Sequence, residues 1–249
     1  MRKKIVAGNW KMNNSSYETI KLLNELIEFN FSKGTRVIVC PAHTQLGIAY
    51  EKLKNSNIEV ASQNMHFELN GAFTGEISAK MIKSVGVLTS IIGHSERRVF
   101  FNETDQILTK KVETAIKENI EVIFCVGEEL SIRKSKKHFR FVQSQLENSV
   151  FLQPKKSWNK IIVAYEPVWA IGTGETASPE EAQEMHFFIR SLISKKYGSD
   201  LANSVSIIYG GSVKPNNAKE IFAKPDVDGG LVGGASLNSE DFAKIVNAF

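Results

Sequence analysis

Eight short runs of apolar and β-branched residues recur along the chain, about 30 residues apart. Several are apolar from end to end, such as Val37–Val39, Val122–Phe124 and Ile161–Val163. This pattern is typical of strands buried on both faces of a parallel sheet. We therefore predict strands at Lys4–Gly8, Arg36–Cys40, Glu59–Ser62, Ser90–Gly93, Glu121–Val126, Lys160–Tyr165, Ser206–Tyr209 and Gly229–Val232.

Amphipathic helical patterns lie between these runs. We predict helices at Tyr17–Phe29, Thr104–Glu118, Phe139–Val150, Pro179–Tyr197, Asn216–Ala223 and Ser239–Ala248. Strict alternation over 249 residues favours an α/β fold, a (β/α)8 TIM barrel of eight parallel strands with crossover helices. We expect residues 1–249 to form a single barrel domain, although length alone also allows two. No GxGxxG follows the first run, which argues against a dinucleotide-binding fold.

Composition indicates which classes of binding partner and which cellular compartment fit this chain. Lys and Arg exceed Asp and Glu by 31 − 27 = 4, a mild excess that fits an anionic substrate better than a nucleic acid. No run approaches the ~20 apolar residues of a membrane span, and no signal-peptide core follows the basic N-terminus. Cys40 and Cys125 each end an apolar run, as buried thiols in a reducing compartment do. We expect a cytoplasmic protein.

Polar residues follow the predicted strands at the end where barrel enzymes carry their active sites. Asn9 and Lys11 follow the first, and His94, Ser95 and Glu96 follow the fourth. With Ser95 as a helix cap, the helix N-terminus is expected to lower the pKa of His94 and keep it a neutral hydrogen-bond donor, although a single histidine is more often structural. Glu166 ends the sixth strand and is a candidate general base.

Two glycine turns and one apolar loop complete the predicted site. Gly210–Ser212 and Gly233–Gly234 follow the last two strands, the usual phosphate position in this architecture, although either pair alone also fits a tight turn. Pro167–Gly174 holds Trp169 and Ile171 between a proline and two glycines. This pattern favours a lid that excludes water over an ordinary connecting loop.

In these segments the chain resembles the triosephosphate isomerase family from end to end. The shared motifs, in order, are Ala7–Asn13, Gly93–Arg98, Cys125–Glu128, Ala164–Gly174, Tyr209–Val213 and Leu231–Leu237. The resemblance implies cofactor-free and metal-free interconversion of dihydroxyacetone phosphate and D-glyceraldehyde 3-phosphate through an enediol(ate), in glycolysis and gluconeogenesis.

The resemblance also implies residue roles. The base maps onto Glu166, the electrophilic histidine onto His94, the electrostatic lysine onto Lys11, and the residue that orients the substrate oxygens onto Asn9; Glu96 matches a carboxylate near that lysine. The substrate phosphate is expected on the backbone of Gly172, Ser212, Gly233 and Gly234.

The segment Gln63–Ser78 is similar to a loop through which family members form homodimers. Its Met65, Phe67 and Phe73 independently suggest a partner surface. The chain departs from the family pattern in the basic segment Ser131–Lys137, at Gly230, which we expect to loosen the last strand, and at Glu175.

Other barrel functions remain open alternatives. One is another phosphate-binding enzyme, such as a sugar-phosphate epimerase or an aldolase; for the latter, the lysines Lys4 and Lys160 lie at the wrong ends of their strands. The other is a non-catalytic binding barrel.

Overall fold

A computed structural model describes residues 2–171 and 176–249. Within them, eight parallel strands form one sheet in the order β3-β2-β1-β8-β7-β6-β5-β4. The strands are β1 (Lys4–Asn9), β2 (Thr35–Cys40), β3 (Ile58–Val60), β4 (Thr89–Ile92), β5 (Glu121–Val126), β6 (Ile161–Tyr165), β7 (Ile207–Tyr209) and β8 (Gly229–Val232). A parallel bridge between Ser62 and Ser90 joins the two edges and closes the barrel. The predicted (β/α)8 TIM barrel is confirmed.

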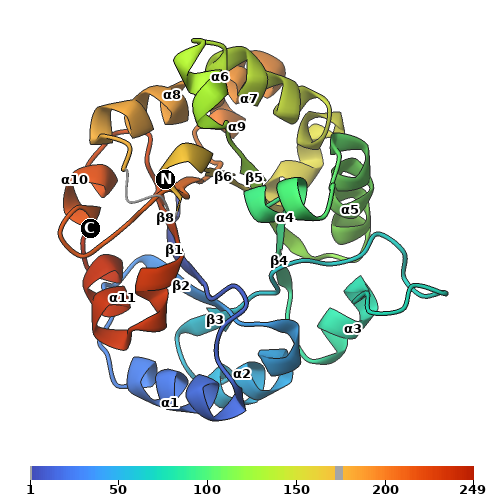
Figure 1. The fold of residues 1–249 in the computed structure, drawn as a ribbon, viewed down its shortest axis with the longest axis vertical. Coiled ribbons are helices and arrows are strands. Elements are labelled where there is room, and N and C mark those ends of the chain that lie inside the picture. Colours follow the sequence, from blue (N-terminus) through green and yellow to red (C-terminus); the bar gives the residue numbers. More distant parts are fainter. Residues whose placement is uncertain (1, 172–175) are drawn as a thin grey trace.

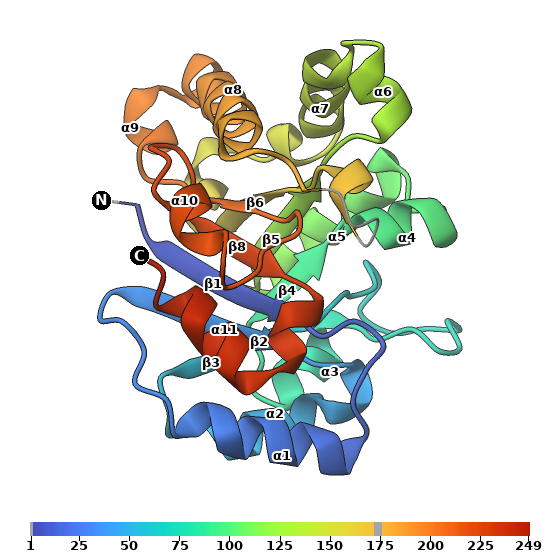
Figure 2. The same ribbon diagram turned by 60° about the vertical axis from the view of Figure 1, so that its left-hand side comes forward.

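Helices surround the barrel on all sides (Figures 1 and 2). They are α1 (Ser16–Ile27), α2 (Leu46–Leu53), α3 (Ala79–Ser84), α4 (Ser95–Phe100), α5 (Asp105–Lys117), α6 (Leu130–Lys134), α7 (His138–Glu147), α8 (Pro179–Tyr197), α9 (Ser199–Ala202), α10 (Ala218–Phe222) and α11 (Ser239–Val246). The long helix α8 matches its predicted bounds because Ser178 and Glu181 form a capping box and Pro179 occupies the first turn. The short helices α2, α3 and α9 were not predicted.

The barrel interior is filled by alternate residues of the seven strands other than β3 and by Ala61, which directly follows β3. These inward-facing residues form one apolar cluster of Ile5, Ala7, Ile38, Cys40, Ala61, Ile91, Ile123, Cys125, Ile162, Ala164, Ile208 and Leu231. The intervening residues pack against the helices, which explains why the strands read as continuous apolar runs. Both cysteines lie in the barrel interior, buried and unpaired, as predicted.

Gly230 leaves room on β8 for a neighbouring aromatic pair, and the looser strand that we expect there stays a prediction. A Cβ at this position would lie 3.1 Å from Cζ of Phe222, whose ring stacks on Phe249 with centroids 4.8 Å apart. The missing side chain makes room for this aromatic pair, so packing replaces what the strand loses in side-chain volume.

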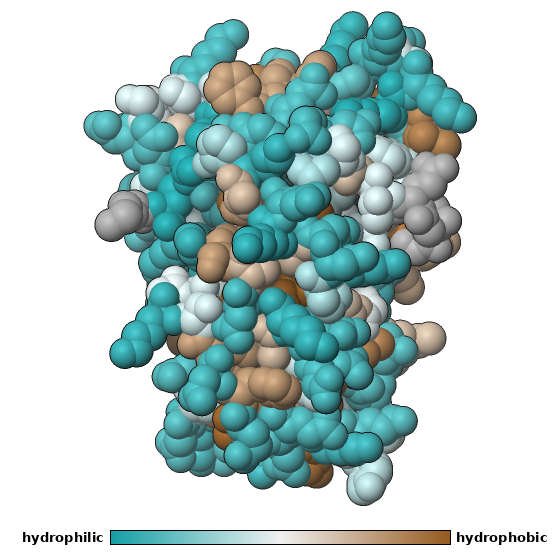
Figure 3. All heavy atoms as spheres, turned by 90° about the vertical axis from the view of Figure 1, so that its left-hand side faces the viewer, coloured by the Kyte–Doolittle hydropathy of each residue, from teal (hydrophilic) through white to brown (hydrophobic). Residues whose placement is uncertain are grey.

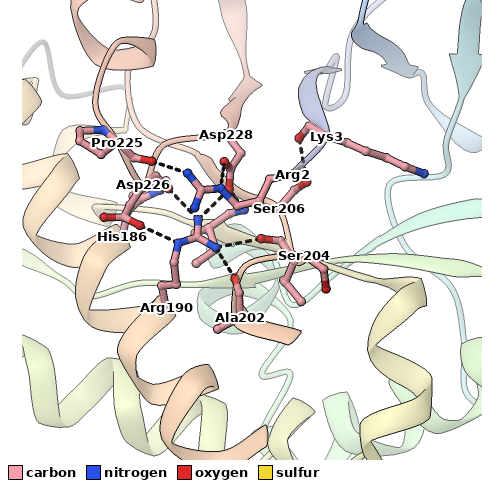
Figure 4. A network of polar contacts seen from close by, with 12 residues as sticks. Arg2, Lys3, His186, Arg190, Ala202, Ser204, Ser206, Pro225, Asp226 and Asp228 are labelled. Carbon is pink, nitrogen blue, oxygen red and sulfur yellow. Dashed lines mark hydrogen bonds and ion pairs between the residues drawn. The ribbon is translucent and has the colours of Figure 1, made fainter. Parts of the chain in front are cut away.

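A buried ionic network covers the opposite end of the barrel from the strands' C-termini (Figure 4). Arg190 donates to Asp226 at 2.6 Å, to Asp228 at 2.8 Å and to the carbonyl oxygens of Ala202 and Val205. Arg2 donates to the other oxygen of Asp228 at 2.7 Å. The network therefore joins the start of β1 to α8 and to the segment before β8.

The molecular face that carries α10 and α11 is mainly hydrophilic, with apolar side chains in small scattered groups (Figure 3). None of the helices in the described ranges combines the length and apolar character needed to cross a membrane. Any large apolar contact surface must therefore be sought on other faces.

Replacing Arg190 with methionine should destabilise the fold strongly. The variant leaves Asp226 buried without its cation, and breaking a buried ion pair from one side typically costs about 3–5 kcal/mol. Urea denaturation should detect this as a lower transition midpoint. The matched control Arg140→Met, on the exposed side of α7, should stay within about 0.5 kcal/mol of the parent. Equal stability of the two variants would contradict the account.

Candidate active site

A cavity of about 720 Å³ opens at the C-terminal ends of the strands. It brings together most of the predicted site residues, from the C-terminal ends of five strands: Asn9, Lys11, His94, Glu166, Ser212, Gly233 and Gly234. Glu96 is not part of the cavity lining and approaches the cavity through its contacts with Lys11 and His94. Gly172, predicted to bind phosphate, and Glu175 lie outside the described residues, as does the end of the predicted lid.

Lys11 is fixed by contacts on both its backbone and its ammonium group. Its backbone has φ +53°, a left-handed conformation that is unfavourable for lysine. The Asn9 side chain accepts from its N–H at 3.1 Å, and Gln63 donates to its carbonyl oxygen at 2.8 Å. Glu96 accepts from Nζ at 2.5 Å. Sequence reasoning missed this role of Gln63, whose only signal was an amide directly after the predicted strand Glu59–Ser62.

His94 and Glu166 meet at the floor of the cavity. His94 Nε2 lies 3.0 Å from Glu166 Oε1, and the backbone N–H of Ser95 donates to Oε2 at 2.9 Å. The N–H of Glu96 donates to His94 Nδ1 at 3.2 Å, which assigns the ring proton to Nε2, the nitrogen that faces Glu166. His94 itself caps α4, so our assignment of the cap to Ser95 is wrong.

The predicted direction of the His94 pKa shift is also wrong for this arrangement. Burial lowers the pKa of His94, but the carboxylates of Glu166 and, to a smaller extent, Glu96 raise it, so the pKa lies above its ordinary value. Conversely, burial raises the pKa of Glu166, while His94 and the Ser95 N–H lower it below its ordinary value. The prediction failed because it considered the helix terminus without the carboxylate delivered by another strand.

Two glycines leave the space that Glu166 occupies. A Cβ at Gly127 would lie 1.7 Å from the Glu166 carbonyl oxygen, and a Cβ at Gly210 would lie 2.8 Å from its Cγ. Real side chains cannot approach so closely, so both positions require glycine if Glu166 is to keep this position. Gly210, in the turn after β7, therefore leaves room for the Glu166 side chain and also belongs to the predicted phosphate region.

The two turns of the predicted phosphate region differ in how they lead into a helix. After Gly233, a short 3-10 helix (Gly234–Leu237) starts at once, and a Cβ on Gly234 would meet no atom within 4 Å. The turn at Ser212, by contrast, does not lead directly into a helix, because α10 begins only at Ala218. Lys214, Asn216 and Asp241 also line the cavity and were not predicted.

The described part of the predicted lid is anchored at its start. Val168–Ala170 forms a 3-10 turn, and Trp169 Nε1 donates to Glu128 Oε1 at 3.1 Å. Ile171 then lines the cavity. In residues 2–171 and 176–249, no group of three or more His, Cys, Asp or Glu side chains is placed to hold a metal ion.

Replacing Glu166 with glutamine should lower the pKa of His94. The neutral amide removes the main charge that raises this pKa, and leaves burial, which lowers it. The imidazole resonances can be followed by NMR during a pH titration, with His43, a histidine outside the cavity lining, as the internal control. A His94 midpoint that stays in place would show that the two groups are not coupled.

Sequence comparisons agree with this geometry. The sequence model of the family described as "Triosephosphate isomerase" matches residues 4–249. The chain is 59% identical over 248 residues to the triosephosphate isomerase of Flavobacterium psychrophilum, covering 99% of both chains. It is 59% identical to that of Flavobacterium johnsoniae over 100% of both chains, and 49% identical to that of Alkaliphilus oremlandii over 99% of this chain and all of the other. The chain belongs to the triosephosphate isomerase family.

Proposed function

We propose that this chain catalyses the interconversion of dihydroxyacetone phosphate and D-glyceraldehyde 3-phosphate as an intramolecular aldose–ketose isomerase. The observation that carries the proposal is the contact of Glu166 with His94 in a cavity that Lys11 and two glycine turns also line. A carboxylate, a ring N–H and a cation are what proton transfer next to a carbonyl requires. Family membership supports the substrate, and gives no support to a sugar-phosphate epimerase.

The proposed reaction starts from Glu166. Its pKa lies below the ordinary value, so the carboxylate is ionised and able to accept a proton from carbon. When it turns from His94 towards the substrate, the imidazole loses the partner that raises its pKa. Burial and the Glu96 N–H at Nδ1 then favour the neutral ring, whose Nε2–H can donate to the carbonyl oxygen. Triosephosphate isomerases are themselves the standard example of a carboxylate base beside a neutral histidine, so these roles follow the family resemblance.

The remaining residues bind and orient. Lys11 opposes the charge of the substrate and of the enediolate, and Glu96 holds its ammonium group in place. Asn9 fixes the backbone of Lys11 and lines the cavity beside it. Backbone N–H groups at Ser212, Gly233 and Gly234 are proposed to bind the phosphate, with Gly172 as a further predicted contact. These steps require no metal or coenzyme.

We further infer a homodimer that forms through the Gln63–Ser78 loop, with each chain acting as one catalytic domain. The loop projects from the barrel in both ribbon views (Figures 1 and 2). Phe73 in this loop is 43% exposed, and Met12 and Tyr17, which follow Lys11, are 96% and 77% exposed. Met65 is fully buried within its own chain, so our expectation that it needs a partner is wrong.

A cytoplasmic location is also proposed. Cys40 and Cys125 are unpaired in the barrel interior, which fits a reducing compartment, and the proposed reaction belongs to glycolysis and gluconeogenesis.

Glu166→Gln should reduce turnover of D-glyceraldehyde 3-phosphate by at least about 10²–10⁴, the typical contribution of a positioned general base. A coupled spectrophotometric assay measures the rate. The variant should still bind inorganic phosphate with nearly the parent's affinity, because Ser212, Gly233 and Gly234 are unchanged. Parent-like turnover would exclude Glu166 as the base, and an inactive parent chain would refute the proposed function itself.

Shortening the loop between Phe67 and Phe73 should produce monomers of low activity. Sedimentation of the parent at micromolar concentration is expected to give about twice the 27.8 kDa chain mass. The control Phe187→Ser removes an exposed aromatic ring from α8, away from the loop, and should leave that mass unchanged (Figure 1). A fully active monomer would contradict the proposed assembly.

A further inference from the structure

Arg133, in the basic segment that overlaps α6, contacts residues at both ends of the connection between β6 and α8. Its side chain is only 14% exposed, although the rest of the segment is mostly solvated. Its guanidinium lies 3.2 Å from Glu181 and 3.6 Å from Glu184, both in the first two turns of α8. It also lies 5.9 Å from the ring centroid of Trp169, at the other end of the same connection.

The third carboxylate near Arg133 is that of Glu128, which is fully buried. Glu128 Oε1 accepts from two neutral donors, Tyr165 at 3.0 Å and Trp169 at 3.1 Å, and Nη1 of Arg133 lies 3.9 Å away. Burial raises the pKa of Glu128, and the two hydrogen bonds and Arg133 oppose that shift. A buried carboxylate needs a nearby cation to remain ionised, and Arg133 supplies one.

This group of side chains lies beside the catalytic carboxylate along the chain. Tyr165 precedes Glu166 directly, and the backbone N–H of Val168 donates to the Glu128 carbonyl oxygen at 3.0 Å. Ile171, two residues after Trp169, forms part of the cavity wall. A displacement of Trp169 would therefore be passed to residues on both sides of the proposed reaction centre.

We propose that Arg133 is a positioning residue for the proposed reaction, which holds Glu128 and Trp169 so that Ile171 and Glu166 keep their places in the cavity. Among the described residues Arg133 is not part of the cavity lining, and it acts through Glu128 and Trp169. The three acidic partners and the indole face explain why arginine suits this position: a planar guanidinium can contact carboxylates along its edge and an aromatic ring with its face. The inference rests on the proposed function.

Arg133→Met should lower kcat by roughly 10-fold or more, since small displacements of site residues are costly, while the affinity for inorganic phosphate changes little. Arg133→Lys, which keeps the charge but not the planar fork, should restore part of the rate. Lys134→Met is the matched control: it removes a neighbouring exposed charge from the same helix and should leave kcat unchanged. If Arg133→Met kept the parent's kcat while the parent was active, the inference would be overturned and the proposed function would stand.

A double-mutant cycle separates positioning from general stability. Trp169→Phe removes the indole N–H, so Arg133→Met should lower kcat far less in that background than in the parent. Independent effects on kcat would overturn the inference. Indole fluorescence supplies a readout that needs no substrate: Arg133→Met should change the emission in the parent background and leave it unchanged in Trp169→Phe, where Trp10 and Trp158 remain. An emission change that persists without Trp169 would also overturn it.

Discussion

Closure of the parallel sheet is the constraint on which the site depends. The bridge from Ser62 to Ser90 joins the two edge strands, so the eight strands end on one rim. A closed barrel has a small interior, which is filled here by aliphatic side chains and two cysteines. Polar residues are excluded from that interior and collect where the strands end. Asn9, His94 and Glu166, far apart in the sequence, reach one cavity for this reason.

The same constraint explains which parts of the fold could be predicted from the sequence. Strands buried on both faces are visible as apolar runs, and α8 is visible because its cap is coded by Ser178 and Glu181. Residues directly after a strand could be assigned to the rim without knowledge of their contacts. Helix α2 was not predicted, and no side-chain cap marks where it begins.

Contacts between rim residues from different strands could not be predicted in the same way. The pKa of His94 depends on Glu166, which a different strand brings to 3.0 Å. Local reasoning from the helix terminus therefore gave the wrong direction. The exposure of Met65 was misjudged for a related reason, because whether a loop residue faces solvent or its own barrel depends on the path of the loop. The family resemblance supplied the residue roles that contact geometry alone would have left open.

Buried carboxylates at the two ends of the barrel have different kinds of partner. At the end of the barrel opposite the active-site cavity, Arg190 donates to two carboxylates, those of Asp226 and Asp228 (Figure 4). Asp228 also accepts hydrogen bonds from Arg2 and from the backbone N–H of Ile207. Each of these carboxylates is paired directly with a cation, an arrangement that resists any movement of the groups. At the rim, Glu166 is at least as deeply buried, yet it accepts from the backbone N–H of Ser95 and otherwise faces the His94 imidazole, 3.0 Å away. A carboxylate held by one backbone N–H and an imidazole can exchange these contacts for a substrate at lower cost than one held by an arginine. The rim therefore keeps its carboxylate buried but available, as the proposed proton transfer requires.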